Sequence, residues 1–559
     1  MIRTAISDRR SELLAYAAIL AVAAILRLGN LATRGMWDAD QGHDMLVLRA
    51  LVLDGRIPLL GPPTSIGDFH HGVLYYVLLA PAAAVSHADP LVVTTWIALG
   101  GVAAVAVTGW LARSIAGPVA GLIAALILAV SSSAVEESIF IWNPNLIALT
   151  SSIALATAWR AWTSGRARWW LVAGAAAVAT MHCHVLGTIL TPVVGGLLVA
   201  DLRRRRRQGD GRGAAAVRRA TLGWLTLALL SYVPLAIHEL GSDASELRAA
   251  AAFLVGGGGP AGIALPARIP IVGLRVLGWP LAGLITAAPV ATILVAALVA
   301  GLTVWRGWLP PGRPVVAGAG RATADPERVA VRWLGLGLAW TIVALAVGAS
   351  SLATVVIGLP NDHYHAFADP MVVVLVAVGL AALIRGAASA PSTPDAGRRP
   401  LLAAAAAAIV MALAGWNLAI QPPARAADGG WSAAMDAAHR VAVASGGGPL
   451  VLASLPAFKT DEALRMPLED QGVAVVPAGD TELPSGGPPA ARAILCDQLF
   501  REAIGADCGG PAEDAWLASP AAGLLARSSA AAAAAPALVL SDRFEAAPGR
   551  WISVYRQQP

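Results

Sequence analysis

The sequence SELLAYAAILAVAAIL, residues 11–26, is almost wholly apolar, and MWDADQGHDM, residues 36–45, follows it closely. The first stretch has the composition of a membrane-spanning helix, which needs about 20 mostly apolar residues. The second stretch holds three aspartates and one histidine in ten residues. Such a dense acidic cluster directly after a membrane helix predicts a functional site at the membrane surface.

The composition of the whole chain excludes most soluble classes. Of 559 residues, 57% are hydrophobic and only 13% are charged, whereas a soluble domain carries about 25% charged residues. The mean hydropathy is +0.65. The net charge of +5 comes from arginines in short loops between apolar segments, which is typical of cytoplasmic membrane anchors. We therefore expect an integral membrane protein that binds membrane lipids and no nucleic acid.

Apolar segments recur along the first 420 residues and predict a polytopic, mainly α-helical bundle with about eleven crossings. The first segment lacks a small-residue cleavage site and is expected to be retained as a helix. The number of crossings is ambiguous at 72–111 and at 268–305, and the short piece 72–86 is a candidate for a re-entrant or interfacial segment. The apolar segments fall at 11–28, 72–86, 90–111, 117–134, 144–162, 168–184, 186–201, 219–238, 268–283, 286–305, 333–357, 370–385 and 401–420.

Arginine placement predicts the orientation, because cytoplasmic loops are enriched in Lys and Arg. The clusters at 3–10, 164–170, 202–213 and 385–400 favour a cytoplasmic N-terminus. The outer loops then hold nearly every group of Asp and His before residue 400, which favours an extracytoplasmic site. The Ala- and Arg-rich composition, with one lysine, indicates a GC-rich bacterial genome and hence a multi-pass protein of the plasma membrane.

The composition changes after residue 420 and predicts a second domain. We expect residues 1–420 to form the membrane domain and residues 421–559 a small extracytoplasmic α/β domain, which docks an acceptor or covers the site. Its expected strands include GPLVLASLP, GVAVVPA, APALVLSD and GRWISVYR. Cys496 and Cys508 either pair in an oxidising compartment or stay free thiols.

Residues 38–54 are predicted to form an amphipathic helix along the outer membrane interface. The spacing of Asp40, His43 and Asp44 would place these side chains on one helix face. A carboxylate there can act as a general base or bind a cation that in turn binds phosphate. The alternative is a surface helix with Asp38 or Asp40 as its N-cap.

Two further stretches carry polar side chains on the predicted outer face. In SIGDFHHGVLYYVLLAP, residues 65–81, Asp68, His70 and His71 precede Tyr75, and an interfacial aromatic belt is the alternative interpretation of the tyrosines. In EESIFIWNPNLIAL, residues 136–149, Trp142 and two asparagines suit sugar contacts, with helix capping and interface anchoring as the alternative.

Together these motifs resemble the GT-C glycosyltransferases, and more narrowly the protein mannosyltransferase and aminoarabinose transferase group of glycosyltransferase family 39. The family's Asp-Glu-Gly-x-Tyr corresponds to Asp40-Gln41-Gly42-His43-Asp44, and its His-Pro-Pro-Leu-x-Tyr to His71-Gly72-Val73-Leu74-Tyr75-Tyr76. His363-Tyr364 before Pro370, and MHCH at 181–184, match its later outer turns. The resemblance covers about residues 10–420.

The resemblance implies a sugar transfer from a polyprenyl-phosphate-linked donor to a hydroxyl of a glycan, lipid or protein acceptor, with inversion. Asp40 would be the catalytic base. Gln41 stands where the family has an acidic residue beside that base, so Asp38 or Asp44 would compensate for the missing acidic partner. The resemblance leaves a divalent metal open as a cofactor. A transporter or lipid flippase for envelope glycans is the alternative function. The expected substrate-binding residues are Asp44, His43, Asp68, His70, His71, Tyr75, His182, His184, His363, Tyr364 and His365, with Arg49 a further candidate for phosphate.

Overall fold

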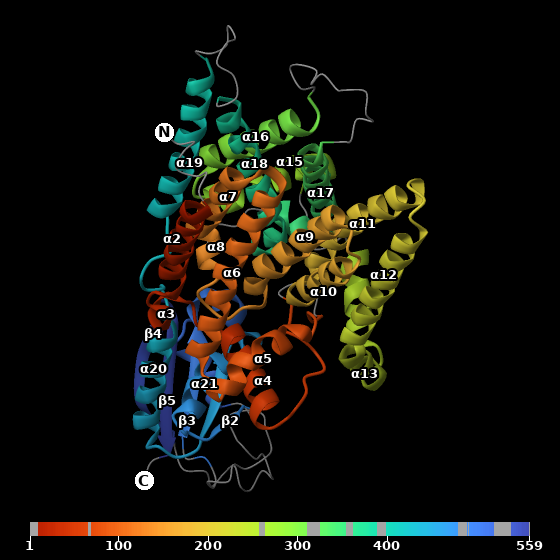
Figure 1. Cartoon of the computed structure of the whole chain (residues 1–559). Helices are drawn as coiled ribbons and strands as arrows, with labels where there is room; N and C mark the ends of the chain where they lie inside the picture. Colours follow the sequence, from red (N-terminus) through yellow and green to blue (C-terminus); the bar gives the residue numbers. More distant parts are fainter. Residues whose placement is uncertain are drawn as a thin grey trace, which may run out of the picture.

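The computed structural model describes residues 9–64, 69–256, 263–309, 325–353, 362–387, 398–478, 489, 491–518 and 538–557. A bundle of helices forms the upper part of the molecule in Figure 1, and a five-stranded sheet lies below it. The helices of the bundle and its short 3-10 turns are α2 Arg9–Leu28, α3 Leu31–Arg34, α4 Ala39–Leu53, α5 Leu74–Ser86, α6 Pro90–Ala116, α7 Pro118–Val130, α8 Ser132–Glu136, η1 Asn143–Leu146, α9 Ile147–Ser164, α10 Arg168–Cys183, η2 Val185–Ile189, α11 Leu190–Arg207, α12 Gly211–Ser231, α13 Val233–Gly241, α14 Ser245–Val255, α15 Leu265–Ala282, α16 Pro289–Gly307, α17 Pro326–Gly348, η3 Ser350–Ala353, η4 Asp362–Ala368, α18 Asp369–Ala387 and α19 Arg398–Ala419.

Eight helical segments of the described chain are long and apolar enough to cross a membrane. The prediction of a polytopic helical bundle is therefore confirmed, while the count of about eleven crossings stays a prediction. Helices α5 and α7 are apolar but have only 13 residues each. At 1.5 Å per residue each is about 20 Å long, which is shorter than a membrane core of about 30 Å. The eight segments are Arg9–Leu28, Pro90–Ala116, Val185–Arg207, Gly211–Gly241, Pro289–Gly307, Pro326–Gly348, Asp362–Arg385 and Pro400–Ala419.

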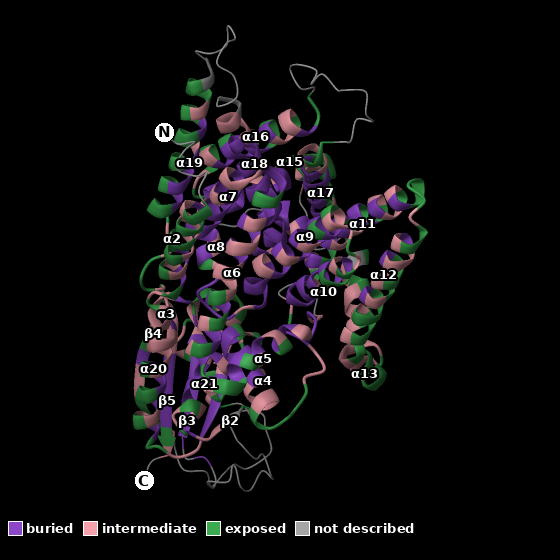
Figure 2. Cartoon of the chain, in the orientation of Figure 1, coloured by how far each residue is buried: buried purple, intermediate pink, exposed green. Residues whose placement is uncertain are grey.

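Burial separates the central helices from the peripheral ones. Helix α18 is apolar on all sides, and 89% of the most apolar stretch of Asp362–Arg385 is buried. Only 6% of the corresponding stretch of Gly211–Gly241, which spans α12 and α13, is buried. Figure 2 shows the same contrast between the bundle centre and the outlying α12 and α13. A strongly apolar helix packs at the centre of a bundle or faces lipid. The burial of α18 fits the first position, and the exposure of α12 and α13 fits the second.

A buried arginine joins the first helix to the bundle. Arg27 in the last turn of α2 is 1% exposed, and it donates hydrogen bonds to the carbonyl oxygens of Leu128 and Ala129 at 3.0 and 2.8 Å. These carbonyls belong to the last turn of α7, which has no intrahelical donors left for them. The contact fixes the end of α2, and therefore the start of the acidic stretch, relative to the bundle.

The two ends of the bundle differ in charge and in what they carry. The N-terminal end of the chain and the turn between α11 and α12 lie at the upper end in Figure 1, opposite the C-terminal sheet and α4. That turn follows five consecutive arginines, 203–207. This arginine run thus lies at the end of the bundle opposite α4 and the C-terminal sheet, and the orientation of the chain in the membrane stays a prediction.

The C-terminal region forms a mixed sheet in the order β2-β1-β3-β5-β4. Strands β2, β1 and β3 are parallel, and β5 and β4 pair antiparallel beside β3. The predicted α/β content after residue 420 is confirmed, and ARAILCD forms a strand. Cys496 and Cys508 are joined by a disulfide bond. The elements are α20 Gly430–Ser445, β1 Leu450–Leu455, η5 Ala457–Lys459, α21 Glu462–Asp470, β2 Val475–Pro477, β3 Ala491–Asp497, η6 Gln498–Phe500, α22 Arg501–Ile504, α23 Pro511–Leu517, β4 Leu538–Ala547 and β5 Arg550–Gln557.

Candidate active site

The acidic stretch begins helix α4 with a complete N-cap. Asp38 is the N-cap residue, and the Gln41 side chain accepts a hydrogen bond from the Asp38 backbone N–H at 2.8 Å, which completes a capping box. The Gln41 amide also donates to the carbonyl oxygen of Ile141 at 2.8 Å. A glutamine serves both bonds because its amide group both accepts and donates. Gln41 is therefore explained by structure, and the capped-helix interpretation of Asp38 is confirmed.

Helix α4 packs closely against helix α21 of the C-terminal region. A Cβ atom on Gly42 would lie 2.1 Å from the carbonyl oxygen of Glu462, so only glycine fits between the two backbones. His43 pairs with the Glu462 carboxylate at 2.9 Å. Burial alone would lower the pKa of His43, but the hydrogen bond to Glu462 raises it above its ordinary value. Arg49 pairs with Glu469 and Asp470 in α21 and is not among the described residues that line the site cavity, and its phosphate contact stays a prediction.

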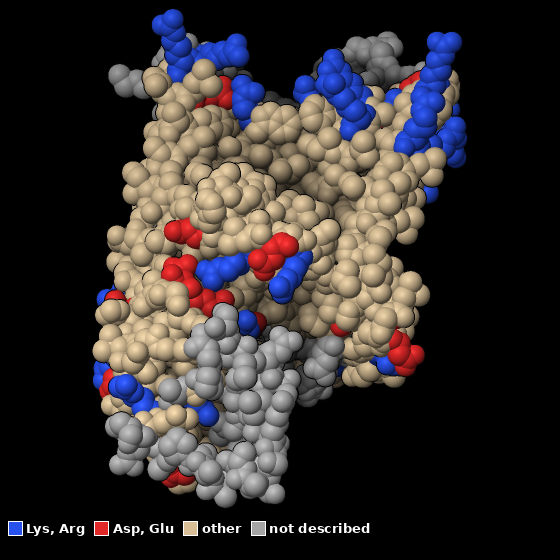
Figure 3. Space-filling model, turned by 90° about the horizontal axis from the view of Figure 1, so that it is seen from below, with Lys and Arg blue, Asp and Glu red and all other residues tan. Residues whose placement is uncertain are grey.

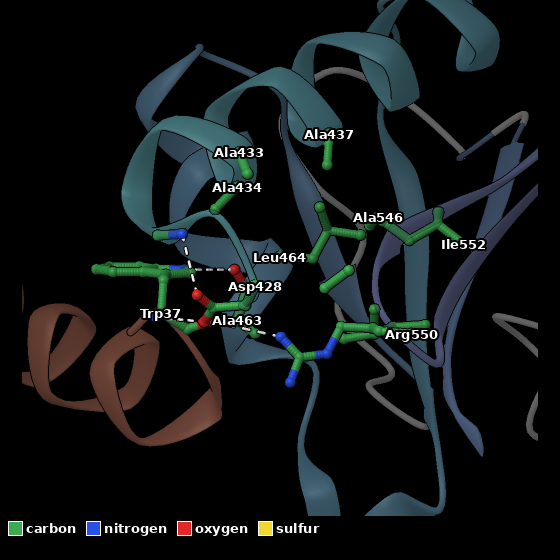
Figure 4. Close-up of a pocket in the computed structure, with 13 residues that line it drawn as sticks. Trp37, Asp428, Ala433, Ala434, Ala437, Ala463, Leu464, Ala546, Arg550 and Ile552 are labelled. Atoms are coloured by element: carbon green, nitrogen blue, oxygen red, sulfur yellow. Dashed lines mark hydrogen bonds between the residues drawn. The ribbon is translucent and has the colours of Figure 1, made fainter. Parts of the chain in front are cut away.

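Trp37 fixes the same interface from the residue before the N-cap. Its indole N–H donates to the Ala463 carbonyl at 2.8 Å, and its backbone N–H donates to Asp428 at 2.7 Å. Arg550 donates to the Trp37 carbonyl at 3.3 Å. Figure 4 shows these four residues around a small void that alanines of α20 also line. Its volume of about 30 Å³ has room for about two waters and is far too small for a sugar.

A much larger cavity of about 670 Å³ lies between the bundle and the C-terminal region. This volume is in the ordinary range for small-molecule sites. It is lined by residues from α4, from the loop that ends at α5, from η1, η2 and η4, and from the two short turns η5 and η6. Seven of the predicted site residues line it, namely Asp40, His43, Asp44, His71, His184, His363 and Tyr364, and so do Trp142 and Asn143 from the stretch predicted to contact sugars.

Asp40 presents a solvent-accessible carboxyl group to this cavity. The surrounding protein displaces bulk water and raises the pKa of Asp40, while the positive charge of Lys459 and a hydrogen bond from the Trp142 side chain act in the opposite direction. A carboxylate with a raised pKa is a stronger base than an ordinary aspartate. Asp40 thus has the accessibility and the basicity that proton removal needs.

The carboxylate of Asp38 is paired with two cationic side chains and is therefore not free to act as a base. Its carboxylate oxygens accept from Lys459 at 2.8 Å and from Arg550 at 2.7 Å. Burial alone would raise the pKa of Asp38, but the charges of Arg550 and Lys459 lower it below the ordinary value. A carboxylate that is paired twice is a poor proton acceptor. Asp38 therefore connects α4 to β5 and to the turn after β1.

Asp44 forms a buried cluster with the two tyrosines at the start of α5. Tyr75 and Tyr76 donate hydrogen bonds to its two oxygens at 2.8 and 2.9 Å. Both tyrosines are fully buried, so the aromatic-belt interpretation is wrong. Burial raises the pKa of Asp44 to about 7, and the nearby positive charge of His43 opposes that shift. The tyrosines support the floor of the cavity and do not line it.

The membrane side of the cavity is a group of aromatic rings. His184 packs against His71 and Tyr364, each with ring centroids 4.8 Å apart. His363 packs against Trp142 at 4.1 Å and against Tyr364 at 4.3 Å. Burial holds the pKa of His71 well below its ordinary value, so this imidazole is neutral at pH 7. Neutral imidazoles and aromatic rings give a wall that can donate hydrogen bonds without adding charge.

The remaining predicted residues lie outside the cavity or outside the described chain. His70 pairs with Glu246 of α14 at 2.9 Å. His182 is buried, and one ring nitrogen lies 2.8 Å from the Ser231 hydroxyl. His365 is buried against Asp362, which forms a bidentate pair with Arg275 at 2.8 and 2.7 Å. Asp68 lies outside the described residues. The part of the chain that the structure describes holds no group of three or more His, Cys, Asp or Glu placed to bind a metal ion.

Three of the described residues that line the cavity come from the C-terminal region and were not predicted. Phe458 and Lys459 follow β1, and Phe500 follows β3. Lys459 is the only lysine in the sequence. Its rarity in the sequence was the one signal that marked it. The two phenylalanines carry no such mark.

The helical bundle and the C-terminal sheet together define the fold of the chain. Two solved structures share it over nearly the whole chain. ArnT from Cupriavidus metallidurans bound to undecaprenyl phosphate matches with a TM-score of 0.55 at 13% identity, covering 98% of each chain. The same protein in the apo state matches with a TM-score of 0.54 at 13% identity, covering 97% of each chain. No protein-family model and no curated protein matches the sequence.

Proposed function

We propose that this protein is a membrane glycosyltransferase that moves a sugar from a polyprenyl phosphate to a hydroxyl group of an extracytoplasmic acceptor. The observation that carries the proposal is Asp40, an accessible carboxylate with a raised pKa in a cavity between a membrane bundle and a C-terminal sheet. The fold shared with ArnT, which has been solved with undecaprenyl phosphate, supports a lipid-phosphate donor.

In the proposed reaction Asp40 accepts the proton of the acceptor hydroxyl. The hydroxyl oxygen attacks the anomeric carbon of the donor sugar, and a new carbon–oxygen bond forms as the bond from that carbon to the phosphate oxygen breaks. The leaving phosphate keeps the electron pair and stays on the lipid. A single displacement inverts the anomeric configuration.

Lys459 is proposed to stabilise the negative charge that develops on the phosphate. It is the only lysine or arginine among the described residues that line the cavity. Its ammonium group lies 2.8 Å from Asp38, which orients it without placing another base at the reacting centre. Fixed charges of this kind stabilise a transition state most when they are oriented before the reaction. His71, His184 and His363 would supply neutral hydrogen-bond donors from the membrane side.

The test uses the full-length protein in lipid nanodiscs with radiolabelled mannosyl, arabinosyl and glucosyl polyprenyl phosphates and a cell-envelope acceptor extract. Asp40→Asn is expected to lower the transfer of label by about 10²- to 10⁴-fold, the contribution of a general base. Asp54→Asn is the matched control, because Asp54 ends the same helix but lies outside the cavity. Equal activity of Asp40→Asn and wild type would refute the base assignment. No release of label from any donor by folded wild type would favour the transporter or flippase alternative.

A further inference from the structure

The wall of the cavity that the C-terminal region supplies differs from the membrane-side wall. The membrane side is formed by buried and half-buried rings, whereas Phe458 is 65% exposed. Phe458 and Phe500 meet edge to face with ring centroids 5.2 Å apart. The Lys459 ammonium lies 5.7 Å from the centre of the Phe500 ring. We name the two rings, Phe458 and Phe500, the aromatic platform; Lys459, assigned above to the donor phosphate, lies beside them.

The platform has the position of a ligand site in an open sheet. Phe458 and Phe500 lie in short turns directly after the carboxyl ends of β1 and β3. These strands are parallel neighbours, and their last paired residues are Leu455 and Cys496. Open sheets with parallel strands bind ligands at the carboxyl ends of those strands. The fold therefore brings both rings to the edge where binding residues collect.

Both turns are fixed by contacts that do not involve the rings. The disulfide between Cys496 and Cys508 closes the segment that carries Phe500. Lys459 is bound to Asp38 at 2.8 Å. Accessible aromatic side chains that are anchored in this way supply large contact area at a small cost in conformational entropy.

We infer that the aromatic platform is the acceptor subsite and that the acceptor is a carbohydrate. This inference rests on the proposed function. The two rings would pack against the apolar C–H face of a sugar ring, while the neighbouring charged groups bind its hydroxyls. Asp40 lines the same cavity as both walls, together with Trp142 on the membrane side and with Phe458, Lys459 and Phe500 on the other side. A hydroxyl of a sugar on the platform would thus face the proposed base.

The test measures acceptor dependence with a defined probe, a delipidated and protease-treated carbohydrate fraction of the cell envelope. Phe500→Ala is expected to raise the half-saturating concentration of this fraction about tenfold, the typical cost of truncating a central aromatic contact. Phe500→Tyr, which keeps the ring, is expected to restore the wild-type value. Leu499→Ala is the matched control, since Leu499 is adjacent, 74% exposed and absent from the cavity lining.

Two results would overturn the inference while leaving glycosyl transfer intact. One is a Phe500→Ala variant that transfers label with the wild-type half-saturating concentration. The other is label that reaches only a protease-sensitive product of the untreated envelope extract, which would identify a protein acceptor. Failure of wild type to release label from any donor is a different result and would refute the proposed function itself.

Discussion

Replacement of Gly42 by alanine is expected to separate α4 from α21. The added Cβ atom would lie 2.1 Å from the Glu462 carbonyl oxygen, 2.4 Å from its carbon and 2.9 Å from the Ala463 nitrogen. An ordinary contact begins at 3.4 Å. The two backbones must therefore move apart by about 1.3 Å, because neither side of the contact is a flexible side chain that can turn away.

The size of the effect follows from this displacement. Overpacking of a fitted interface costs about 1 to 3 kcal/mol, and the better helix propensity of alanine returns about 1 kcal/mol. A small loss of stability is therefore expected. The loss of activity should be larger, because Lys459 lies three residues before Glu462 and moves with it. A misplacement of about 1 Å at a catalytic centre can lower the rate about 100-fold.

The assay compares thermal unfolding and label transfer for Gly42→Ala and Gly195→Ala in the same nanodiscs. Gly195 lies inside α11, and a Cβ atom there would meet nothing within 4 Å. Its replacement is expected to keep the transfer rate and to raise the melting temperature slightly, because alanine has the better helix propensity. Wild-type transfer by Gly42→Ala would refute the argument that the C-terminal region must sit tightly on α4 for the cavity to work.

Four further outcomes are expected. Because Asp40 must be unprotonated to act as the base and burial raises its pKa, kcat/KM should rise with pH through a value above the ordinary aspartate pKa of about 3.9; a profile limited at that ordinary value would contradict this. The Asp44 pKa of about 7 means that the folded state binds more protons than the unfolded chain, so stability should fall as the pH rises from about 4 to 7, by roughly 4 kcal/mol; unfolding curves of Asp44→Asn should lack that slope. Asp362→Asn should destabilise the protein by about 3 to 5 kcal/mol, since it leaves the buried Arg275 without its bidentate carboxylate, and a melting temperature equal to that of Asp54→Asn would argue otherwise. Replacing both Cys496 and Cys508 by serine should raise the half-saturating acceptor concentration, because the segment that carries Phe500 loses its closure; the concentration dependence of transfer by the double variant checks this.

The sequence predicted the fold well where local patterns decide it. Long apolar segments specify membrane helices by length alone, and the alternation in GRWISVYR specifies β5. The capping of α4 was open to prediction as well, because Asp38 and Gln41 have the spacing of a capping box. The face shared by Asp40, His43 and Asp44 followed from helical periodicity, and all three side chains line the cavity.

The site was less predictable where it depends on long-range contacts. The burial of Tyr75 and Tyr76 depends on Asp44, which lies about 30 residues earlier in the chain. The pairing of Arg49 depends on α21, which is more than 400 residues away. Phe458 and Phe500 reach the cavity only because the C-terminal sheet rests on α4. No local sequence pattern predicts contacts between residues that lie so far apart along the chain.

The single lysine of this sequence offers a chemical handle. Reagents that acylate primary amines have one side-chain target here, and that target is on the wall of the cavity. A fluorophore or crosslinker introduced this way would report on the site in the unmodified protein, with the N-terminal amine as the other reactive group. Protection of Lys459 from acylation by a lipid phosphate or a glycan would then rank ligands by footprinting, before any product of the reaction has been identified.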